Sequence, residues 1–341
     1  MTAKRGYRLA QVQVRTIGED EAGMRLDRWF REHFPDLGFG QLQKLLRTGQ
    51  VRVDGGRVKT STRLDSGQTV RIPPGIGADA PKRPIKPPMP GDSGKEAAFL
   101  RSILLFEDRD VFVFNKPSGL SVQGGSGTTR HLDGMLDALR DKSGQKPRLV
   151  HRLDKDTSGV LVVARTRKAA SELAKSFRAR STRKIYWALV KGVPKPRQGR
   201  ISTYLVRGEG EDSERMLVVA KGDEEASHAL THYSVNEQAG QKLAWVTLKP
   251  VTGRTHQLRA HMAHIGHPIV GDPKYFEIEN WELPGGIQNR LHLHARRIVV
   301  PHPREGVLDV SAPLPPHMQQ SWNLLGFGNE AADDDFDEDE K

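Results

Sequence analysis

A run of prolines and glycines divides this chain into a short and a long segment. Residues 73–95 hold seven prolines and four glycines in 23 positions. This density prevents regular packing and is typical of a stiff, partly extended tether. We therefore predict a linker at residues 73–96, which separates a small domain at 24–72 from a large one at 97–320.

The charge of the chain favours a polyanionic partner. Lys and Arg exceed Asp and Glu by 53 to 42, although residues 330–341 hold eight acids beside the single Lys341. This tail, which we expect to be disordered, therefore carries −7 and the rest of the chain +18. Such a body suits nucleic acid or anionic lipid, and nucleic acid is favoured because no basic amphipathic helix or lipidation motif offers a membrane anchor. The composition alone is explained equally well by an alternative, in which the positive charge only keeps the protein soluble.

Several classes of protein are excluded by composition. The chain has no cysteine, which excludes disulfides, thiolate nucleophiles, cysteine-ligated zinc and iron–sulfur clusters. No apolar run approaches the roughly 20 residues that a membrane span needs, and the first residues lack the apolar stretch of about 7 to 15 residues that marks a secretion signal. We therefore expect a cytoplasmic protein without membrane association.

Residues 24–72 are predicted to form a small basic α/β domain. A hydrophobic stripe at helical spacing marks a first helix within 24–34, and a second short helix follows the breaker run 35–40. Residues 51–59 then have the pattern of a hairpin with a turn at Asp54-Gly55-Gly56, and 69–72 that of a further strand. The stripe of the first helix consists of Leu26, Trp29, Phe30 and Phe34.

This order of elements, and the stretch RLDRWF…QKLLRTGQVRVDGGRVK, resemble the S4 RNA-binding domain. The resemblance covers nearly all of residues 24–72 and implies a basic helix and loop that face folded RNA. The alternative is that the charges only form the solvated face of amphipathic helices. Four cations that lie in a segment with one acid, Asp54, are expected to contact RNA phosphates. We call them the module cations: Lys44, Arg47, Arg52 and Arg57.

The long segment is predicted to be an α+β domain. It contains more short β-branched runs than helical stretches, and the clearest helix lies at residues 167–180. Because no regular βαβ alternation is visible, a mixed, largely antiparallel sheet is favoured over a doubly wound one. The predicted strands include 111–114, 160–163, 185–190, 244–248 and 298–300.

Common catalytic and metal-binding motifs are missing from the sequence. There is no P-loop, nucleophile elbow, H-E-x-x-H or Rossmann fingerprint. Seven of the 13 histidines lie between His256 and His302, and His261, His264 and His267 follow one another at three-residue spacing. A zinc site would need a third ligand that the sequence does not nominate. We therefore expect no metal and no cofactor, and interpret the histidines as polar contacts or RNA-facing groups.

The densest chemical signal is His151 to Gly159, HRLDKDTSG, which leads directly into a buried-strand pattern. Asp154 lies between Arg152 and Lys155, and the Ser-Gly pair supplies a tight turn. From the residues alone, a polar loop whose Asp and Thr cap backbone groups explains this segment as well as an active site does.

The motif H-R-L-D-x-x-T-S-G is similar to the active-site motif of the RluA-type pseudouridine synthases, without a departure. Three further segments resemble motifs of that family in the same order, so that the resemblance runs over roughly residues 100–300. Because an S4-like domain precedes these motifs, the resemblance is greatest to the branch of the family that modifies large-subunit ribosomal RNA. One departure is Gln123, where members often have His, and this position is assigned no role. The three segments are NKPSG at 115–119, KIYWA at 184–188 and TGRTHQLRAH at 252–261.

The resemblance implies isomerisation of uridine to pseudouridine in RNA, with the pseudouridine synthase fold and no cofactor. The N1–C1′ bond breaks, the uracil turns over and C5 bonds to C1′. Asp154 would be the catalytic carboxylate, as a nucleophile or as a base on the sugar. Tyr186 would stack on the flipped uracil, Arg254 would pair with Asp154, and Arg152 would fill the gap left by the base.

Two alternatives remain open at this stage. One is a non-catalytic RNA-binding or ribosome-assembly factor that retains the fold. The other is an RNA glycosylase, which would want a second carboxylate, and Asp156 is the nearest. For the favoured reading we expect ribosomal RNA as the partner, no membrane, no small-molecule cofactor and a monomer.

Overall fold

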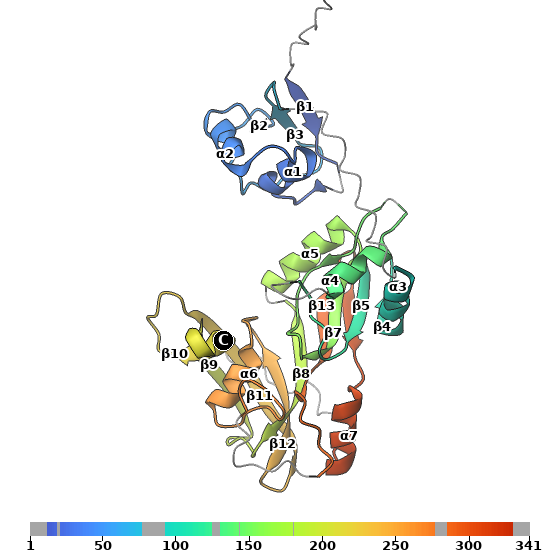
Figure 1. Cartoon of the computed structure of the whole chain (residues 1–341), viewed down its shortest axis with the longest axis vertical. Helices are drawn as coiled ribbons and strands as arrows, with labels where there is room; N and C mark the ends of the chain where they lie inside the picture. Colours follow the sequence, from blue (N-terminus) through green and yellow to red (C-terminus); the bar gives the residue numbers. More distant parts are fainter. Residues whose placement is uncertain are drawn as a thin grey trace, which may run out of the picture. The chain divides into compact units, whose positions relative to one another are not determined.

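The computed structural model describes residues 12–18, 21–76, 93–124, 130–142, 144–179, 181–276 and 285–329 (Figure 1). The chain divides into two compact units, Met1–Ser93 with Thr166–Ser171, and Gly94–Arg165 with Glu172–Lys341. We describe each by itself. Most of the predicted linker, residues 77–92, and the whole acidic tail, residues 330–341, lie outside the described residues.

The first unit contains a three-stranded antiparallel sheet and two helices. The strands lie in the order β1 (Gln13–Thr16), β3 (Thr69–Ile72), β2 (Arg52–Val53). Both predicted helices are confirmed, as α1 (Leu26–His33) and α2 (Phe39–Arg47). All four residues of the predicted stripe are buried in the core of this unit.

The predicted hairpin at 51–59 is wrong. Residues 57–59 form no strand, and β2 pairs instead with β3, Arg52 opposite Arg71. The turn after β2 is closed by the Gly56 N–H, which donates to the Val53 carbonyl at 2.8 Å. The Asp54 carboxylate accepts from the backbone N–H of Thr69 at 2.7 Å and from its hydroxyl at 2.9 Å. This side chain therefore ties the turn to the distant strand β3 and not to the next residues in sequence.

The second unit is built on one sheet of 11 strands. The strands follow the order β10-β9-β11-β12-β8-β13-β7-β5-β4, with β14 added to β13 and β6 to β7. The pairing of β13 with β7 is parallel and the other pairings are antiparallel, which confirms a mixed, largely antiparallel sheet. The strands are β4 (Leu104–Glu107), β5 (Val111–Lys116), β6 (Arg148–Leu149), β7 (Ser158–Ala164), β8 (Arg183–Lys191), β9 (Gln198–Arg207), β10 (Met216–Val219), β11 (Ser227–Ala239), β12 (Leu243–Pro250), β13 (Leu293–Pro301) and β14 (Val307–Ser311).

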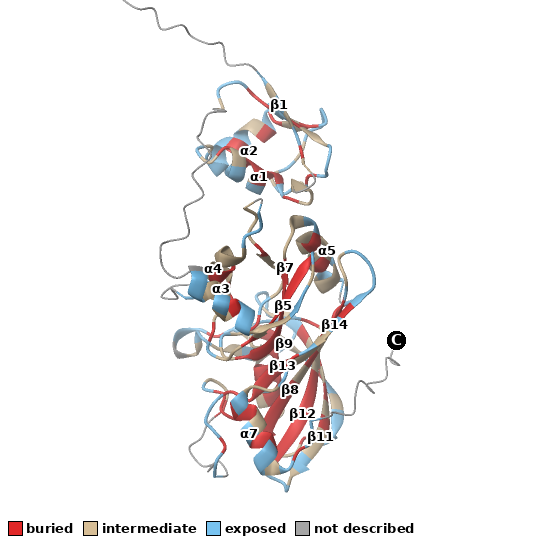
Figure 2. Cartoon of the chain, turned by 90° about the vertical axis from the view of Figure 1, so that its right-hand side faces the viewer, coloured by how far each residue is buried: buried red, intermediate tan, exposed pale blue. Residues whose placement is uncertain are grey.

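Helices cover both faces of the middle of this sheet. Because side chains of a strand alternate between faces, β8 contributes Trp187 to a cluster with Trp322 of α7, and Ala188 to a cluster with Met262 of α6. Figure 2 shows β8 and its neighbours β12 and β13 largely in red, the colour of buried residues. None of the helices in the described ranges is long and apolar enough to cross a bilayer. The helices are α3 (Ser93–Ser102), α4 (Leu132–Met135), α5 (Arg167–Arg178), α6 (Gln257–His264) and α7 (Pro316–Leu325).

Candidate active site

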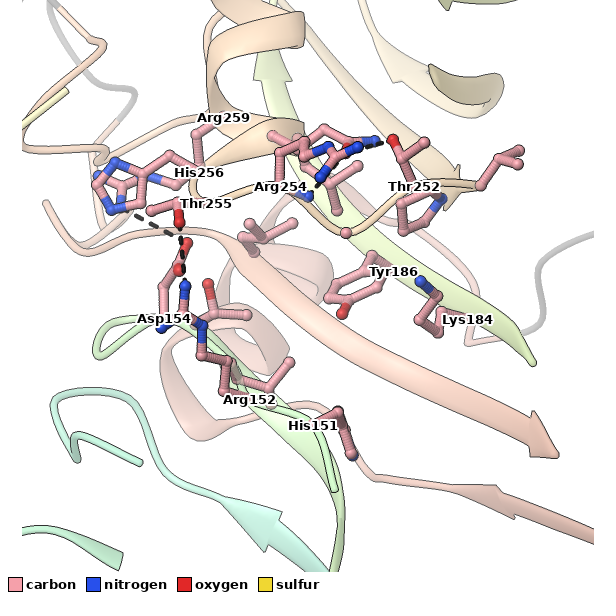
Figure 3. Close-up of a pocket in the computed structure, with 18 of the residues that line it drawn as sticks. His151, Arg152, Asp154, Lys184, Tyr186, Thr252, Arg254, Thr255, His256 and Arg259 are labelled. Carbon is pink, nitrogen blue, oxygen red and sulfur yellow. Dashed lines mark hydrogen bonds and ion pairs between the residues drawn. The ribbon is translucent and has the colours of Figure 1, made fainter. Parts of the chain in front are cut away.

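A cavity of about 520 Å³ lies in the second unit (Figure 3). Three of the four segments noted in the sequence line it. These are the loop 151–157 that leads into β7, residues Lys184 and Tyr186 of β8, and residues 252–259, which run from the end of β12 into α6. Segments that are about 100 residues apart along the chain therefore meet at one site.

The carboxylate of Asp154 faces a buried guanidinium in this cavity. Nη1 of Arg259 lies 4.0 Å from Oδ2 of Asp154. The same guanidinium donates from Nε and Nη2 to the two carboxylate oxygens of Asp272, at 2.7 and 2.6 Å. Arg259 is 2% exposed and Asp272 0%, whereas Asp154 is 29% exposed. The bidentate pair fixes the orientation of Arg259, which directs its remaining donor towards an accessible carboxylate.

Arg254 does not occupy the place that the sequence analysis expected. No ion pair joins it to Asp154 in the part of the chain that the structure describes, and its Nε donates to the His228 carbonyl at 3.0 Å on the exposed rim. The reason lies in the turn before α6, where the Arg254 N–H donates to Oε1 of Gln257 and His256 adopts a left-handed conformation with φ 48°. This turn directs the side chain of Arg254 outwards. Arg259 lies after the turn, within α6, and is the arginine that faces Asp154.

Tyr186 presents an aromatic ring to the cavity from β8. Its ring is partly buried and packs against the hydrophobic clusters on either side of the cavity. Burial, and to a lesser extent the charge of Asp154, raise the pKa of its hydroxyl. The phenol therefore stays neutral over the working range of pH.

Arg152 and His151 hold the loop of Asp154 in different ways. Arg152 is exposed, and its Nη2 donates to the Thr255 hydroxyl at 3.2 Å, across the cavity (Figure 3). The Nε2 of His151 accepts from the Val162 N–H at 2.8 Å, and its ring stacks on Phe177 at 4.7 Å. Burial, with a contribution from the charge of Lys184, lowers the pKa of His151 to about 3. This imidazole is thus a neutral acceptor that anchors the loop to β7.

Lys116, in the NKPSG segment, is a site residue that the sequence analysis did not single out. Its side chain is fully buried, and its Nζ donates to the carbonyls of Pro117, Leu120 and Lys155 at 3.0, 2.8 and 2.9 Å. Burial lowers its pKa to about 7, against the opposing charges of Asp156 and Asp154. Three carbonyl acceptors match the three N–H groups of an ammonium, so the charged form is the one that fits this cage. Lys116 therefore fixes the backbone next to Asp154.

The glycine that ends the HRLDKDTSG segment is required by packing. Gly159 has φ 112°, and a Cβ at this position would lie 2.2 Å from the carbonyl oxygen of Ala295 on β13. The close approach of β7 to β13 therefore accepts glycine alone.

Similarity to known proteins agrees with this geometry. A family model described as RNA pseudouridylate synthase matches residues 110–264. The ribosomal large subunit pseudouridine synthase C of Salmonella typhi is 35% identical over 322 residues, which cover 92% of this chain and 97% of that protein. The protein of the same name from Escherichia coli (strain K12) is 36% identical over 311 residues, covering 89% and 93%. The chain belongs to the RNA pseudouridylate synthase family.

Solved structures support the same assignment of this RNA pseudouridine synthase. Human RNA Pseudouridylate Synthase Domain Containing 4 superposes with a TM-score of 0.58 at 29% identity, covering 69% of this chain and 97% of that one. The family resemblance, the pseudouridine synthase fold of the large domain and the assignment as an isomerase are thereby confirmed.

The histidines of this pseudouridine synthase are largely engaged by protein groups. His261 contacts the hydroxyls of Thr231 and Thr203, each at 2.9 Å, through its two ring nitrogens. His292 and His294 likewise use both nitrogens on protein partners. These contacts link strands and helices and leave no ring nitrogen of the three for a metal ion.

Outside the cavity, one group of described residues has the composition of a metal site. Potential ligand atoms of Asp108, Asp110 and His302 lie within 4.8 Å of one another. His302 contacts Asp108 at 2.8 Å, and Asp110 forms an ion pair with Arg304. The group is therefore an internally paired network in the second unit.

In the first unit, the module cations gather around the turn after α2. Lys44 and Arg47 are exposed in the last turn of that helix. A Cβ on Gly49 would lie 3.6 Å from Nη2 of Arg52 and 3.5 Å from Nε of Arg57, so both guanidinium groups lie beside this turn. Arg52 also donates to the carbonyls of Gly49 and Gly55.

Proposed function

We propose that this enzyme converts specific uridines of large-subunit ribosomal RNA to pseudouridine, with Asp154 as the catalytic carboxylate. The observation that carries the proposal is the partly exposed Asp154 carboxylate held opposite the buried Arg259–Asp272 pair. The choice of substrate rests on the names of the relatives that match along almost their whole length.

The chemistry requires one carboxylate next to the ribose. Asp154 would attack C1′ or take a proton from C2′ as the N1–C1′ bond breaks. The uracil then turns over, C5 bonds to C1′, and the proton on C5 is lost while N1 gains one, so that the product is an isomer of the substrate. Arg259 would hold the carboxylate in a fixed orientation.

The other side chains of the cavity fit a flipped base. Extrusion of a nucleotide from a stem costs a few kcal/mol of stacking, which contacts to the base must offset. Tyr186 would stack on the uracil, and Arg152 would occupy the space left in the RNA, since a guanidinium can both stack and bind phosphate. Arg254, on the rim, would contact the RNA backbone and not the carboxylate.

A hydrolytic glycosidase is not supported by the site. Asp154 is the one carboxylate among the described residues that line the cavity, and Asp156 is not among them. Hydrolysis of a glycosidic bond ordinarily uses two carboxylates on either side of it.

We further propose that residues 24–72 act as an S4-like RNA-binding domain, that 73–96 link it to the catalytic domain at 97–320, and that the protein is a cytoplasmic monomer. The exposure of Lys44, Arg47 and Arg57 supports the first point. No ion pair or side-chain hydrogen bond is formed by these three cations within the described residues, which leaves them available to phosphate.

Mapping of pseudouridine in ribosomal RNA from cells with and without the gene tests the proposal. We expect a small, discrete set of large-subunit sites to lose the modification and to regain it with the wild-type gene, but not with an Asp154→Asn allele. An unchanged map would overturn the assignment of substrate, and would favour a non-catalytic role in RNA binding or ribosome assembly.

A further inference from the structure

A second polar surface lies on the sheet of the catalytic unit, away from α6. Strands β9, β11 and β12 are paired so that Arg200, His232 and Lys249 stand directly opposite one another. Side chains of directly paired residues project from the same face of a sheet. These three residues therefore form a row of basic side chains across three strands.

The orientation of this face follows from the alternation of burial. Ile201, Thr231, Tyr233 and Leu248, which flank the row along the strands, are buried. Three of them, Ile201, Tyr233 and Leu248, belong to the cluster that α6 covers (Figure 1). The basic row points the other way: Arg200 is exposed, and His232 and Lys249 are partly exposed.

An aromatic pair lies on the same face, four residues along β11 from His232. His228 stands opposite Tyr204 of β9, their ring centroids are 5.5 Å apart, and the two planes form an angle of 62°. The exposed His228 ring is also fixed by Nε2, which contacts the Ser202 hydroxyl at 3.0 Å. An ordered, accessible ring on a β-sheet is a surface on which an unpaired base can stack.

This face carries two cations close together, and the one carboxylate of strands β9, β11 and β12 lies away from them. Arg200 and Lys249 stand in the basic row, Arg207 projects from the opposite face by strand alternation, and Glu237 lies near the far end of β11. The charges of Arg200 and Lys249 also lower the pKa of His232, after the larger effect of burial. Such a surface complements a polyanion and disfavours an apolar partner.

One end of this face borders the loop that forms the rim of the catalytic cavity, although the cavity itself lies on the α6 side of the sheet. The loop after β12 runs beside β11, where the Leu230 N–H donates to the Thr252 hydroxyl at 2.9 Å. The next basic residue of that loop, Arg254, donates to the carbonyl of His228. An RNA strand that leaves the cavity across Arg254 and passes round this end of β11 would meet the aromatic pair first and the basic row next.

We propose that this face binds the RNA segment that flanks the target uridine, by stacking of a base on His228 and by phosphate contacts to Arg200 and Lys249. We call it the sheet platform: Arg200, Ser202, Tyr204, His228, His232 and Lys249. The proposal rests on the RNA substrate proposed above, and it deepens that proposal by adding a specificity surface to the cavity. Charge complementarity, and the loop that this face shares with the rim of the cavity, favour RNA as the occupant over an acidic protein segment.

Two sheet-platform variants and one matched control test this proposal in the full-length enzyme. Arg200→Ala/Lys249→Ala removes two platform cations, and His228→Ala removes the stacking ring. The control, Lys221→Ala/Lys242→Ala, removes the same charge from exposed residues of the turns before β11 and before β12. The substrate is a transcript of large-subunit ribosomal RNA in which wild-type enzyme forms pseudouridine, so a failure of the proposed function is seen before the variants are compared.

We expect both platform variants to act on KM and not on kcat. For the double variant, KM rises at least about fivefold and the slope of log K against log salt falls by about 0.7 to 0.9 for each lost phosphate contact. Loss of one stacked base raises KM roughly 5- to 150-fold for His228→Ala. The control retains the wild-type KM and salt slope.

Photocross-linking of wild-type enzyme to the same transcript with 4-thiouridine supplies a second measurement that does not depend on the folding of variants. We expect cross-links in peptides that contain 200–204 or 227–232, to nucleotides close in sequence to the modified uridine. Wild-type KM in folded platform variants, or cross-links that avoid both peptides, would overturn the proposal. The same results would indicate that another partner, such as an acidic protein segment, uses this face.

Discussion

Replacement of Arg259 by glutamine is expected to damage both stability and catalysis, because this side chain serves two carboxylates. Asp272 is fully buried, and in Arg259→Gln its carboxylate would keep, among the residues that the structure describes, the N–H groups of Lys274 and Tyr275 as hydrogen-bond donors. Removal of one partner from a buried ion pair costs about 3 to 5 kcal/mol. For a domain of this size that corresponds to a fall of roughly 6 to 20 °C in Tm.

The catalytic loss has a separate cause. Arg259 is the cation that faces Asp154, at 4.0 Å, and a displacement of reacting groups by about 1 Å can lower a rate by about 100-fold. The double variant Arg259→Gln/Asp272→Asn removes both buried charges and should regain part of the lost stability. It should not regain the rate, because nothing then orients Asp154.

Thermal unfolding and single-turnover formation of pseudouridine at saturating RNA, well below the Tm of every variant, measure these effects. Arg254→Gln is the matched control, since it makes the same change five residues earlier, in the loop before α6, and it should keep the wild-type Tm and most of the saturated rate. The reasoning is refuted if Arg254→Gln slows the saturated reaction more than Arg259→Gln does, or if the double variant restores the rate along with the Tm.

Three further outcomes are expected. Alanine at all four module cations should weaken RNA binding and lower the salt slope by about 0.7 to 0.9 per lost phosphate contact, with the saturated rate intact; an unchanged slope would contradict the assignment. Incubation with EDTA should leave activity unchanged, because the nitrogens of the buried histidines described above are bonded to protein groups; a chelator-sensitive enzyme restored by zinc would contradict this. Acid should destabilise the fold between about pH 6.5 and 4. Burial lowers the pKa of His292 and of His294 to about 4 in the folded protein, so below about pH 6.5 the unfolded state binds more protons than the folded state. Each of the two histidines then lowers the free energy of unfolding by up to about 3 kcal/mol as the pH falls. Urea titrations at pH 7 and pH 5 measure it, and equal stability at both would contradict it.

Much of the fold could be predicted because local patterns and tertiary packing agree. The stripe of α1 is buried as its spacing indicates, and β7 is buried along its whole length, as its run of small and β-branched residues indicates. The hairpin prediction failed because the side chain of Asp54 bonds to Thr69, 15 residues further on. No local turn rule contains that information.

In the candidate site, too, some features could be predicted from the sequence and others could not. A motif could place Asp154 and Tyr186 near each other, and the structure brings both to one cavity. It could not tell which arginine of TGRTHQLRAH faces the carboxylate, because that depends on the left-handed turn at His256 and on the buried Asp272. The role of Lys116 depends in the same way on carbonyl groups up to 39 residues away.

The central claim is that Asp154 performs the chemistry, and single-turnover formation of pseudouridine by purified Asp154→Asn tests it most directly. The amide keeps the shape of the side chain but cannot act as nucleophile or base. Asp156→Asn, two residues along the same loop and outside the cavity, is the control. We predict no product with Asp154→Asn, an affinity for RNA within a few-fold of wild type, and product formation by Asp156→Asn. Measurable turnover by the pure Asp154→Asn enzyme would contradict the account.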